Sequence, residues 1–352
     1  MLNFNTKCNI AHTYMAQSYP LNHIFPEKFF GYAQGETVEE SAGPKHKMNE
    51  KQLSDLYDRT DQDIIKRIAM SKYLLPDQLH QYLWLSGRRI STGDVCRRLR
   101  KLMMTRTIRQ VQVTDGENGL KKLDCYKLDY WGNKYIYSHG MYLHTGVKYL
   151  PYKSAVDQDK LDGPVEVKKV LIANQLLLNM LKNHIDVCRF GFMDTLRPVS
   201  EIYDTYEEVT APMLRTHLNV TINPFFTGGG SCNTPVLLSY EVVRCNPEAL
   251  DHLANKIKRF EAFENRELYP CVNYHPYAGS MHFVICGESE AHNREVYDYL
   301  KKAEGIDSDL RILFTDDLLV QKGDTALYEF TKEGNAVYYQ LPSYTMPEQY
   351  AA

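Results

Sequence analysis

The sequence predicts a mixed protein of the α+β / α/β class, in which a small helical domain with a β-hairpin precedes a larger α/β domain. Three amphipathic segments and two alternating segments follow one another between residues 61 and 128, whereas helices and strands alternate from residue 164 onward. The 352 residues, 43% hydrophobic and 24% charged, are typical of a globular protein of two or three domains. We therefore expect an irregular arm at 1–55, the helical domain at 56–150, the α/β domain at 151–330 and a tail at 331–352.

Two helices are expected after the arm, whose glycines and prolines are scattered among polar residues without a period. The first runs from Asp61 to about Lys72, and its apolar residues recur at helical spacing, as Ile64, Ile65, Ile68 and Ala69. The second begins at Pro76, a residue tolerated in a first helical turn, and is stopped by Gly87.

A third helix is predicted to be basic on its outer side. Ser91 or Thr92 caps it, and its apolar residues fall on one arc, as Val95, Leu99, Leu102 and Met103. Arg97, Arg100 and Lys101 are therefore expected to point away from the core, with Arg98 at the edge of the arc.

A hairpin follows this helix. In the segment 107–128, apolar residues alternate with polar ones, a turn falls between Asp115 and Gly119, and the chain returns through Leu123 to Leu128. Three short helices followed by a hairpin are the order of a winged helix-turn-helix, in which the third helix enters the DNA major groove and the hairpin lies along the backbone.

The charge distribution fits a duplex DNA partner. Eleven basic and four acidic residues lie between Asp61 and Arg109, a balance of +7, although the whole chain is at −3. Neutralised phosphates dominate the affinity of proteins for DNA. The expected contact residues are Arg88, Arg89, Thr92, Arg97, Arg98, Arg100, Lys101, Arg109, Lys121 and Lys122. Two alternatives remain open, namely a solvated helix face and a protein docking module.

The second half has the element order of a nuclease fold. A helix from Pro164 is followed by three strands, a helix from Pro247 to about Asn265, a strand, a helix from Glu290 to Lys302 and a further strand. This order resembles the core of the PD-(D/E)XK nucleases, which is a restriction-endonuclease-like α/β fold.

The combined pattern resembles the replication-relaxation family of plasmids and integrative elements. The resemblance spans about Leu56 to Leu319 and is carried by the segments "DQDIIKRIAMSKYLLPDQLHQYLW", "STGDVCRRLRKL", "YKLDYWGNKYI" and "LLSYEVVRCNPEALDHLANKIKRFEAF". It implies a DNA-binding accessory protein of a mobile element that acts in plasmid replication or relaxation, conjugative transfer or local regulation. Relaxase or replication proteins and a second copy of the chain are then further expected partners.

Catalysis by the second domain is not expected. A PD-(D/E)XK site needs an aspartate on its second strand and Glu-x-Lys on its third, because two carboxylates hold Mg²⁺ and the lysine activates water. Here the second strand offers Asn219 or Asn223, and the third offers Glu241 with Val243 in place of the lysine. The flanking helices offer weak candidates to replace the missing carboxylate and lysine, namely Glu166 and Lys258. The alternatives are an active Mg²⁺-dependent nuclease and a protein-interaction adaptor.

An inert second domain could still add contacts with the DNA backbone. Its basic candidates are Arg244, Lys256, Lys258 and Arg259. The eight cysteines show no C-x-x-C pairing, so we expect reduced thiols, no metal and no cofactor. No apolar run approaches the roughly 18 residues of a membrane span, which predicts a cytoplasmic protein without a membrane partner.

Overall fold

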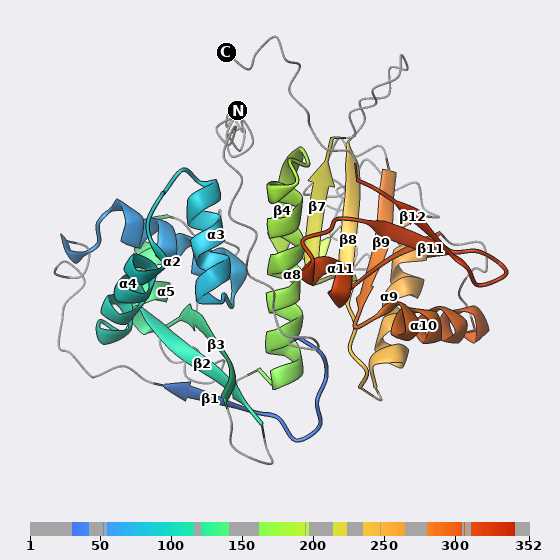
Figure 1. Ribbon diagram of the computed structural model, residues 1–352, viewed down its shortest axis with the longest axis horizontal. Coiled ribbons are helices and arrows are strands. Elements are labelled where there is room, and N and C mark those ends of the chain that lie inside the picture. Colours follow the sequence, from blue (N-terminus) through green and yellow to red (C-terminus); the bar gives the residue numbers. More distant parts are fainter. Residues whose placement is uncertain are drawn as a thin grey trace, which may run out of the picture. The chain divides into compact units, whose positions relative to one another are not determined.

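The computed structural model describes residues 30–41, 52, 55–115, 121–140, 162–193, 195–196, 214–223, 235–246, 248–264, 280–304, 306 and 311–341. The chain divides into two compact units, whose main segments are Tyr32–Asn174, here the N-terminal unit, and Gln175–Ala352, here the C-terminal unit. Figure 1 shows the elements of both units. The predicted boundary near residue 150 thus differs from this division, because residues 162–174 belong to the N-terminal unit.

The N-terminal unit contains three helices followed by a hairpin, in the predicted order. The helices are α2 (Arg59–Ser71), α3 (Pro76–Leu85) and α4 (Thr92–Met104). The hairpin strands β2 (Ile108–Thr114) and β3 (Lys121–Leu128) pair antiparallel, and α5 (Tyr130–Ser138) follows them.

The apolar stripes predicted for these helices form the core of the unit. Ile64, Ile65 and Ile68 of α2 are buried, as are Val95, Leu99 and Leu102 of α4. Met103, which we also expected on the buried arc of α4, is only half-buried. The amphipathic period therefore orients α4 correctly, and its outer side is polar.

The predicted irregular arm contains a strand. β1 (Thr37–Ser41) pairs antiparallel with β2 and completes a three-stranded sheet in the order β1-β2-β3. Its sequence, TVEES, lacks apolar alternation, so no periodic signal marks it. The pairing is instead supported across strands, since the hydroxyl oxygens of Thr37 and Thr114 lie 2.8 Å apart and Glu40 forms ion pairs with Arg109 and Lys127.

The division between the units falls inside α8 (Pro164–Lys182). Within the N-terminal unit, the amide of Gln78 donates to the Leu171 carbonyl at 2.8 Å. Within the C-terminal unit, the amide of Asn179 donates to the Val320 carbonyl at 2.6 Å.

The C-terminal unit is built on a seven-stranded mixed sheet in the order β12-β11-β10-β9-β8-β7-β4. Its strands are β4 (Val187–Phe192), β7 (Leu218–Ile222), β8 (Val236–Val242), β9 (Ser280–Gly287), β10 (Ile312–Asp316), β11 (Leu327–Phe330) and β12 (Ala336–Tyr339). β8, β9 and β10 run parallel, whereas the other neighbours pair antiparallel. A separate pair is formed by β5 (Thr195–Leu196) and β6 (Leu214–Arg215).

Helices α9 (Ala249–Glu264) and α10 (Glu290–Lys302) share one hydrophobic core with this sheet (Figure 1). Core residues of α9 include Ile257 and Phe260, and they pack with Phe283 of β9 and Phe314 of β10. The short helix α11 (Asp317–Gln321) follows β10 directly. The larger sheet and its helices show the predicted order of helix, three strands, helix, strand, helix and strand as far as β10, whereas α11, β11 and β12 after it were not predicted.

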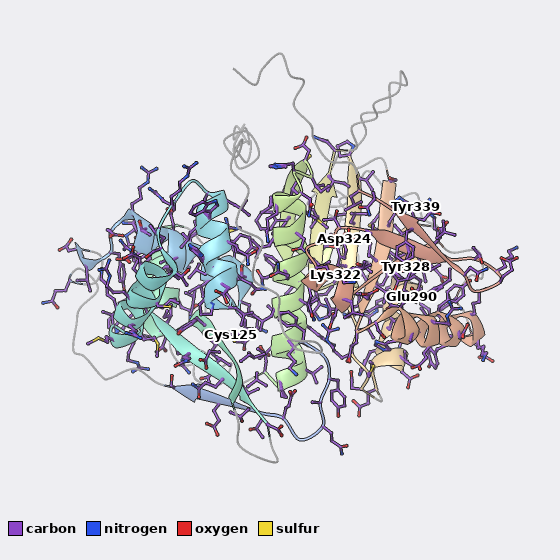
Figure 2. All side chains as sticks on the ribbon, viewed as in Figure 1. Cys125, Glu290, Lys322, Asp324, Tyr328 and Tyr339 are labelled. Carbon is purple, nitrogen blue, oxygen red and sulfur yellow. The ribbon has the colours of Figure 1, made fainter. Side chains whose placement is uncertain are left out.

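The tail expected at 331–352 begins with part of a hairpin. β12 pairs antiparallel with β11, and Leu327 lies opposite Tyr339. Figure 2 labels Tyr328 and Tyr339 on these strands and Glu290 at the start of α10. Three of the four β12 residues are exposed, so the strand has no apolar alternation to mark it in the sequence.

In the described part of the chain, no helix combines the length and the apolar character that crossing a bilayer requires.

Candidate functional site

The outer side of α4 is the first candidate site. Ser91 caps the helix, since its hydroxyl accepts from the backbone N–H of Asp94 at 3.1 Å. The Arg97 side chain is 76% exposed, and Thr92 and Arg100 are exposed as well. Arg97 pairs with Asp94 at 2.6 Å, but exposed pairs of this kind contribute little energy and leave the guanidinium accessible to a ligand.

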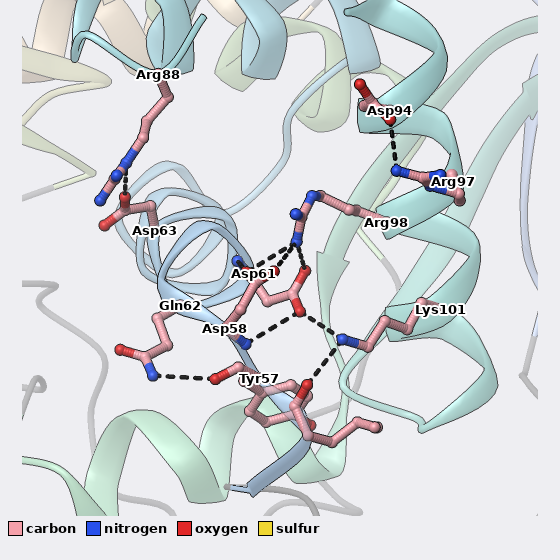
Figure 3. Close-up of polar contacts among 11 residues, drawn as sticks. Tyr57, Asp58, Asp61, Gln62, Asp63, Arg88, Asp94, Arg97, Arg98 and Lys101 are labelled. Carbon is pink, nitrogen blue, oxygen red and sulfur yellow. Dashed lines mark hydrogen bonds and ion pairs between the residues drawn. The ribbon is translucent and has the colours of Figure 1, made fainter. Parts of the chain in front are cut away.

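Two of the predicted contact residues turn inward instead. Figure 3 shows that Arg98 and Lys101 reach Asp61 on α2, whose carboxylate is completely buried. Arg98 Nη1 lies 2.7 Å from one Asp61 oxygen, and Lys101 Nζ lies 2.6 Å from the other. Lys101 also donates to the backbone carbonyl of Leu56 at 2.8 Å. The expectation that Lys101 points away from the core is therefore wrong, because its long side chain bends back to a buried carboxylate.

Asp58 extends this ion-pair network, which we call the Asp61 network (Asp58, Asp61, Arg98 and Lys101). Asp58 is the N-cap of α2, and its carboxylate accepts from Asp61 N–H at 2.9 Å and from Arg98 at 2.8 Å. Burial opposes the charged form of Asp58, but these hydrogen bonds prevail and lower its pKa. Burial likewise opposes the charge on Arg98, but Asp58 and Asp61 raise its pKa. The network thus ties α4 to the start of α2.

Other members of the predicted set also serve the fold. Arg88 pairs with Asp63 at 2.8 Å, and Arg109 pairs with Glu40 at 2.5 Å and with Asp129 at 2.6 Å. The side chains of Lys121 and Lys122 lie outside the described residues.

Of the eight predicted residues whose side chains the structure describes, four are exposed: Arg89, Thr92, Arg97 and Arg100. The Arg89 guanidinium lies over the Trp84 ring at 5.8 Å from its centroid, which leaves its donors able to meet a phosphate.

The second candidate site lies on the C-terminal unit around Glu241 of β8. This carboxylate is buried, and Lys256 of α9 lies 2.6 Å from its Oε1. His217 Nδ1 lies 3.1 Å from Oε2, and the Val242 N–H donates to the same nitrogen at 3.2 Å. Burial alone would raise the pKa of Glu241, but the neighbouring His217 and Lys256 lower it to about 2.

Asn219 of β7 lies on the same face of the sheet as Glu241. It is directly opposite Ser239, two residues before Glu241 on β8, and side chains alternate between the faces of a strand. Its Oδ1 accepts from Ser239 at 2.8 Å and from Thr216 at 2.9 Å. Of the two asparagines considered for the aspartate position, only Asn219 fits, since Asn223 donates to Asp186 at 3.0 Å.

The substitutes predicted from the helices do not join this site. Lys258 is exposed, and the lysine that meets Glu241 is Lys256, two positions earlier on α9. Glu166 pairs with Lys169 of its own helix at 3.9 Å. Val243 packs in the hydrophobic core. In the part of the chain that the structure describes, no group of three or more His, Cys, Asp or Glu side chains could hold a metal ion.

A further charged cluster lies at the carboxyl ends of the parallel strands, around Arg244. Arg244 is 1% exposed, donates to the Val243 carbonyl at 2.9 Å and lies 3.2 Å from Asp317. Burial raises the pKa of Asp317 to about 6; Arg244 opposes this shift, while Glu288 and Asp316 add to it. Arg244 therefore cannot contact a DNA backbone, contrary to our expectation.

Sequence reasoning missed His217 as a partner of Glu241 and Asp317 as a partner of Arg244. His217 is 24 residues from Glu241 in the sequence and Asp317 is 73 residues from Arg244, and no motif links either pair. Residues 175–352 contain 15 basic and 25 acidic residues, a balance of −10, whereas residues 1–174 carry +7. The excess of positive charge therefore lies in residues 1–174.

No family model matches this chain, and neither a curated protein nor a solved structure is significantly similar to it. The likeness to the replication-relaxation family accordingly rests on sequence segments and on the order of the elements.

The Asp61 network predicts that Asp61→Asn destabilises the N-terminal unit. The change leaves Arg98 and Lys101 facing a neutral group at a buried position, and we expect a loss of about 2 to 4 kcal/mol, less than for a fully buried pair because both cations are partly exposed. Urea denaturation followed by circular dichroism measures it. Asp94→Asn is the matched control, with an expected loss below about 1 kcal/mol. Equal effects of the two changes would contradict a structural role for the network.

The lowered pKa of Glu241 predicts an acid-sensitive C-terminal unit. A carboxylate whose pKa is lower in the folded state contributes stability that is complete above its unfolded value, about 4.5, and is lost as the pH falls toward about 2. The urea midpoint should therefore fall between pH 5 and pH 3 in the parent and fall less in Glu241→Gln. The same acid dependence in both proteins would contradict the ion pair.

Proposed function

We propose that this chain is a DNA-binding protein whose N-terminal unit is a winged helix-turn-helix. The proposal is supported by α4, which buries Val95, Leu99 and Leu102 and exposes Thr92, Arg97 and Arg100 on the opposite side. A helix of this kind, preceded by two others and followed by a hairpin, suits insertion into a major groove. Arginine is also the side chain best suited to bidentate contacts with guanine and phosphate.

The Asp61 network reduces the set of side chains that we propose to contact DNA. Arg98 and Lys101 hold α4 against α2, so they position the reading helix and make no DNA contact. The side chains that contact the duplex are then those of Arg89, Thr92, Arg97 and Arg100. A rigid support of this kind lowers the entropy that the helix loses on binding.

The biological role that we propose is that of an accessory protein of a mobile element, acting at an origin of replication or transfer or as a local regulator. It rests on the resemblance to the replication-relaxation family, which also makes relaxase or replication proteins and a second copy of the chain candidate partners.

We propose further that the C-terminal unit is a PD-(D/E)XK-like scaffold that no longer cleaves DNA. Asn219 stands where the fold would use an aspartate, and its Oδ1 is already occupied by two hydroxyl groups. Glu241 is a single carboxylate paired with Lys256, so a divalent cation would have to displace the ammonium group.

The central test replaces both outward arginines of α4 with alanine, as Arg97→Ala/Arg100→Ala. Fluorescence anisotropy with a labelled pool of duplexes of random sequence should show weaker binding, because two phosphate or guanine contacts are removed. The slope of log affinity against log salt should become shallower by about 2 if both contacts are to phosphates. The melting temperature should stay unchanged, since both side chains are exposed.

The matched control for this test is Lys301→Ala/Lys302→Ala, which removes two exposed cations from α10. It should bind the pool as tightly as the parent. Equal weakening by both double variants would indicate charge attraction without a specific role for α4, and unchanged binding in the α4 variant would exclude this helix as the DNA-contacting element.

The scaffold proposal predicts no cleavage of supercoiled or linear DNA in the presence of Mg²⁺ or Mn²⁺. Agarose electrophoresis after prolonged incubation measures nicked and linear products. Cleavage by the parent that disappears in both Glu241→Ala and Lys256→Ala would contradict the proposal and make these two residues catalytic. Cleavage that survives both changes would come from a contaminating nuclease or from another part of the chain.

A further inference from the structure

Gly93, in the first turn of α4, has no structural requirement for glycine among the described residues. Its backbone does not adopt the positive φ that favours glycine. A Cβ atom placed there would meet only the Ser91 hydroxyl oxygen, at 3.8 Å, which is an ordinary van der Waals distance. Alanine would therefore fit without any movement, and it is the better helix former.

Gly132 of α5, in contrast, is a glycine that packing requires. A Cβ atom at Gly132 would lie 2.1 Å from the Thr107 carbonyl oxygen and 3.0 Å from a Leu128 methyl carbon. That glycine is fixed by the close approach of its own neighbours. Within the described residues, no atom lies that close to the Cβ position of Gly93. Glycine therefore lowers the stability of α4 at this position without relieving a steric clash.

The place of Gly93 on α4 indicates what could approach it. Gly93, Arg97, Arg100 and Met104 recur at intervals of four, three and four residues, so they form one stripe along the helix. We call this the outward stripe, and it lies opposite the buried residues of α4. The Arg97 side chain is 76% exposed and Met104 is 54% exposed, so nothing within the described residues covers the stripe.

We infer that Gly93 is the point at which α4 comes closest to the DNA duplex, and that its missing side chain lets the helix backbone lie directly against the sugar–phosphate chain or the base edges. This inference rests on the proposed function. Glycine is the residue that permits a backbone to approach a ligand closely, and the first turn of a recognition helix is the part that enters deepest into the major groove. Arg97 and Arg100 then contact the duplex farther along the same stripe.

The experiment adds a single methyl group at this point, as Gly93→Ala in the full chain. Because alanine favours the helix, the melting temperature should be equal to or higher than that of the parent. Affinity for the duplex pool of random sequence should nevertheless fall by about tenfold, because the methyl group holds the helix away from the duplex. Gly93→Leu should weaken binding further. A gain in stability with a loss of binding is a pair of effects that a purely structural glycine would not give.

The matched control is Gly163→Ala, another glycine of the N-terminal unit whose Cβ position is open, and which should leave DNA affinity unchanged. If Gly93→Ala binds as tightly as the parent while Arg97→Ala/Arg100→Ala loses binding, the inference on Gly93 is wrong and the proposed function stands. If Gly93→Ala lowers both the melting temperature and the affinity, the glycine serves the fold and the inference is also wrong. If the parent itself does not bind the pool, the proposed function fails first.

Discussion

The buried carboxylate of Asp61 is the constraint on which the arrangement of the N-terminal unit depends. An isolated charge in a protein interior is costly, so Asp61 must be met by cations and hydrogen-bond donors. Arg98 and Lys101 of α4 supply the cations at 2.7 and 2.6 Å, and the backbone N–H of Asp58 donates at 3.3 Å. Satisfying this one group fixes α4 against the first turn of α2.

The same requirement explains why the basic segment 61–109 exposes fewer arginines than it contains. Carboxylates of other elements balance several of its cations, as Asp63 does for Arg88 and Glu40 for Arg109. The exposed arginines of this segment are Arg89, just before α4, and Arg97 and Arg100 on α4. Under the proposed function, a few arginines on a rigidly held helix suit specific contacts, because few side chains must be ordered on binding.

In the C-terminal unit, ion pairing also involves a buried carboxylate. Glu241 and Lys256 lie 2.6 Å apart. The hydroxyl groups of Ser239 and Thr216 donate to Asn219 Oδ1 on the same face of the sheet. The proposal that this unit does not cleave DNA rests on these contacts, because they engage the groups that would otherwise bind a cation.

The sequence by itself determined the order of the main helices and strands and the buried side of α4, because hydrophobic periodicity is a local property that neighbouring residues set. It also offered Asn219 or Asn223, and Glu241, as the positions to compare with a nuclease site. It did not reveal β1, β11 or β12, whose residues lack apolar alternation and are held by cross-strand partners. Tertiary structure alone decided that Lys101 turns inward while Arg100 stays exposed, and that Lys256 rather than Lys258 meets Glu241. The reason is that a long charged side chain goes to the nearest buried opposite charge, and the distance to that charge is set by residues that are 15 to 40 positions away in the sequence.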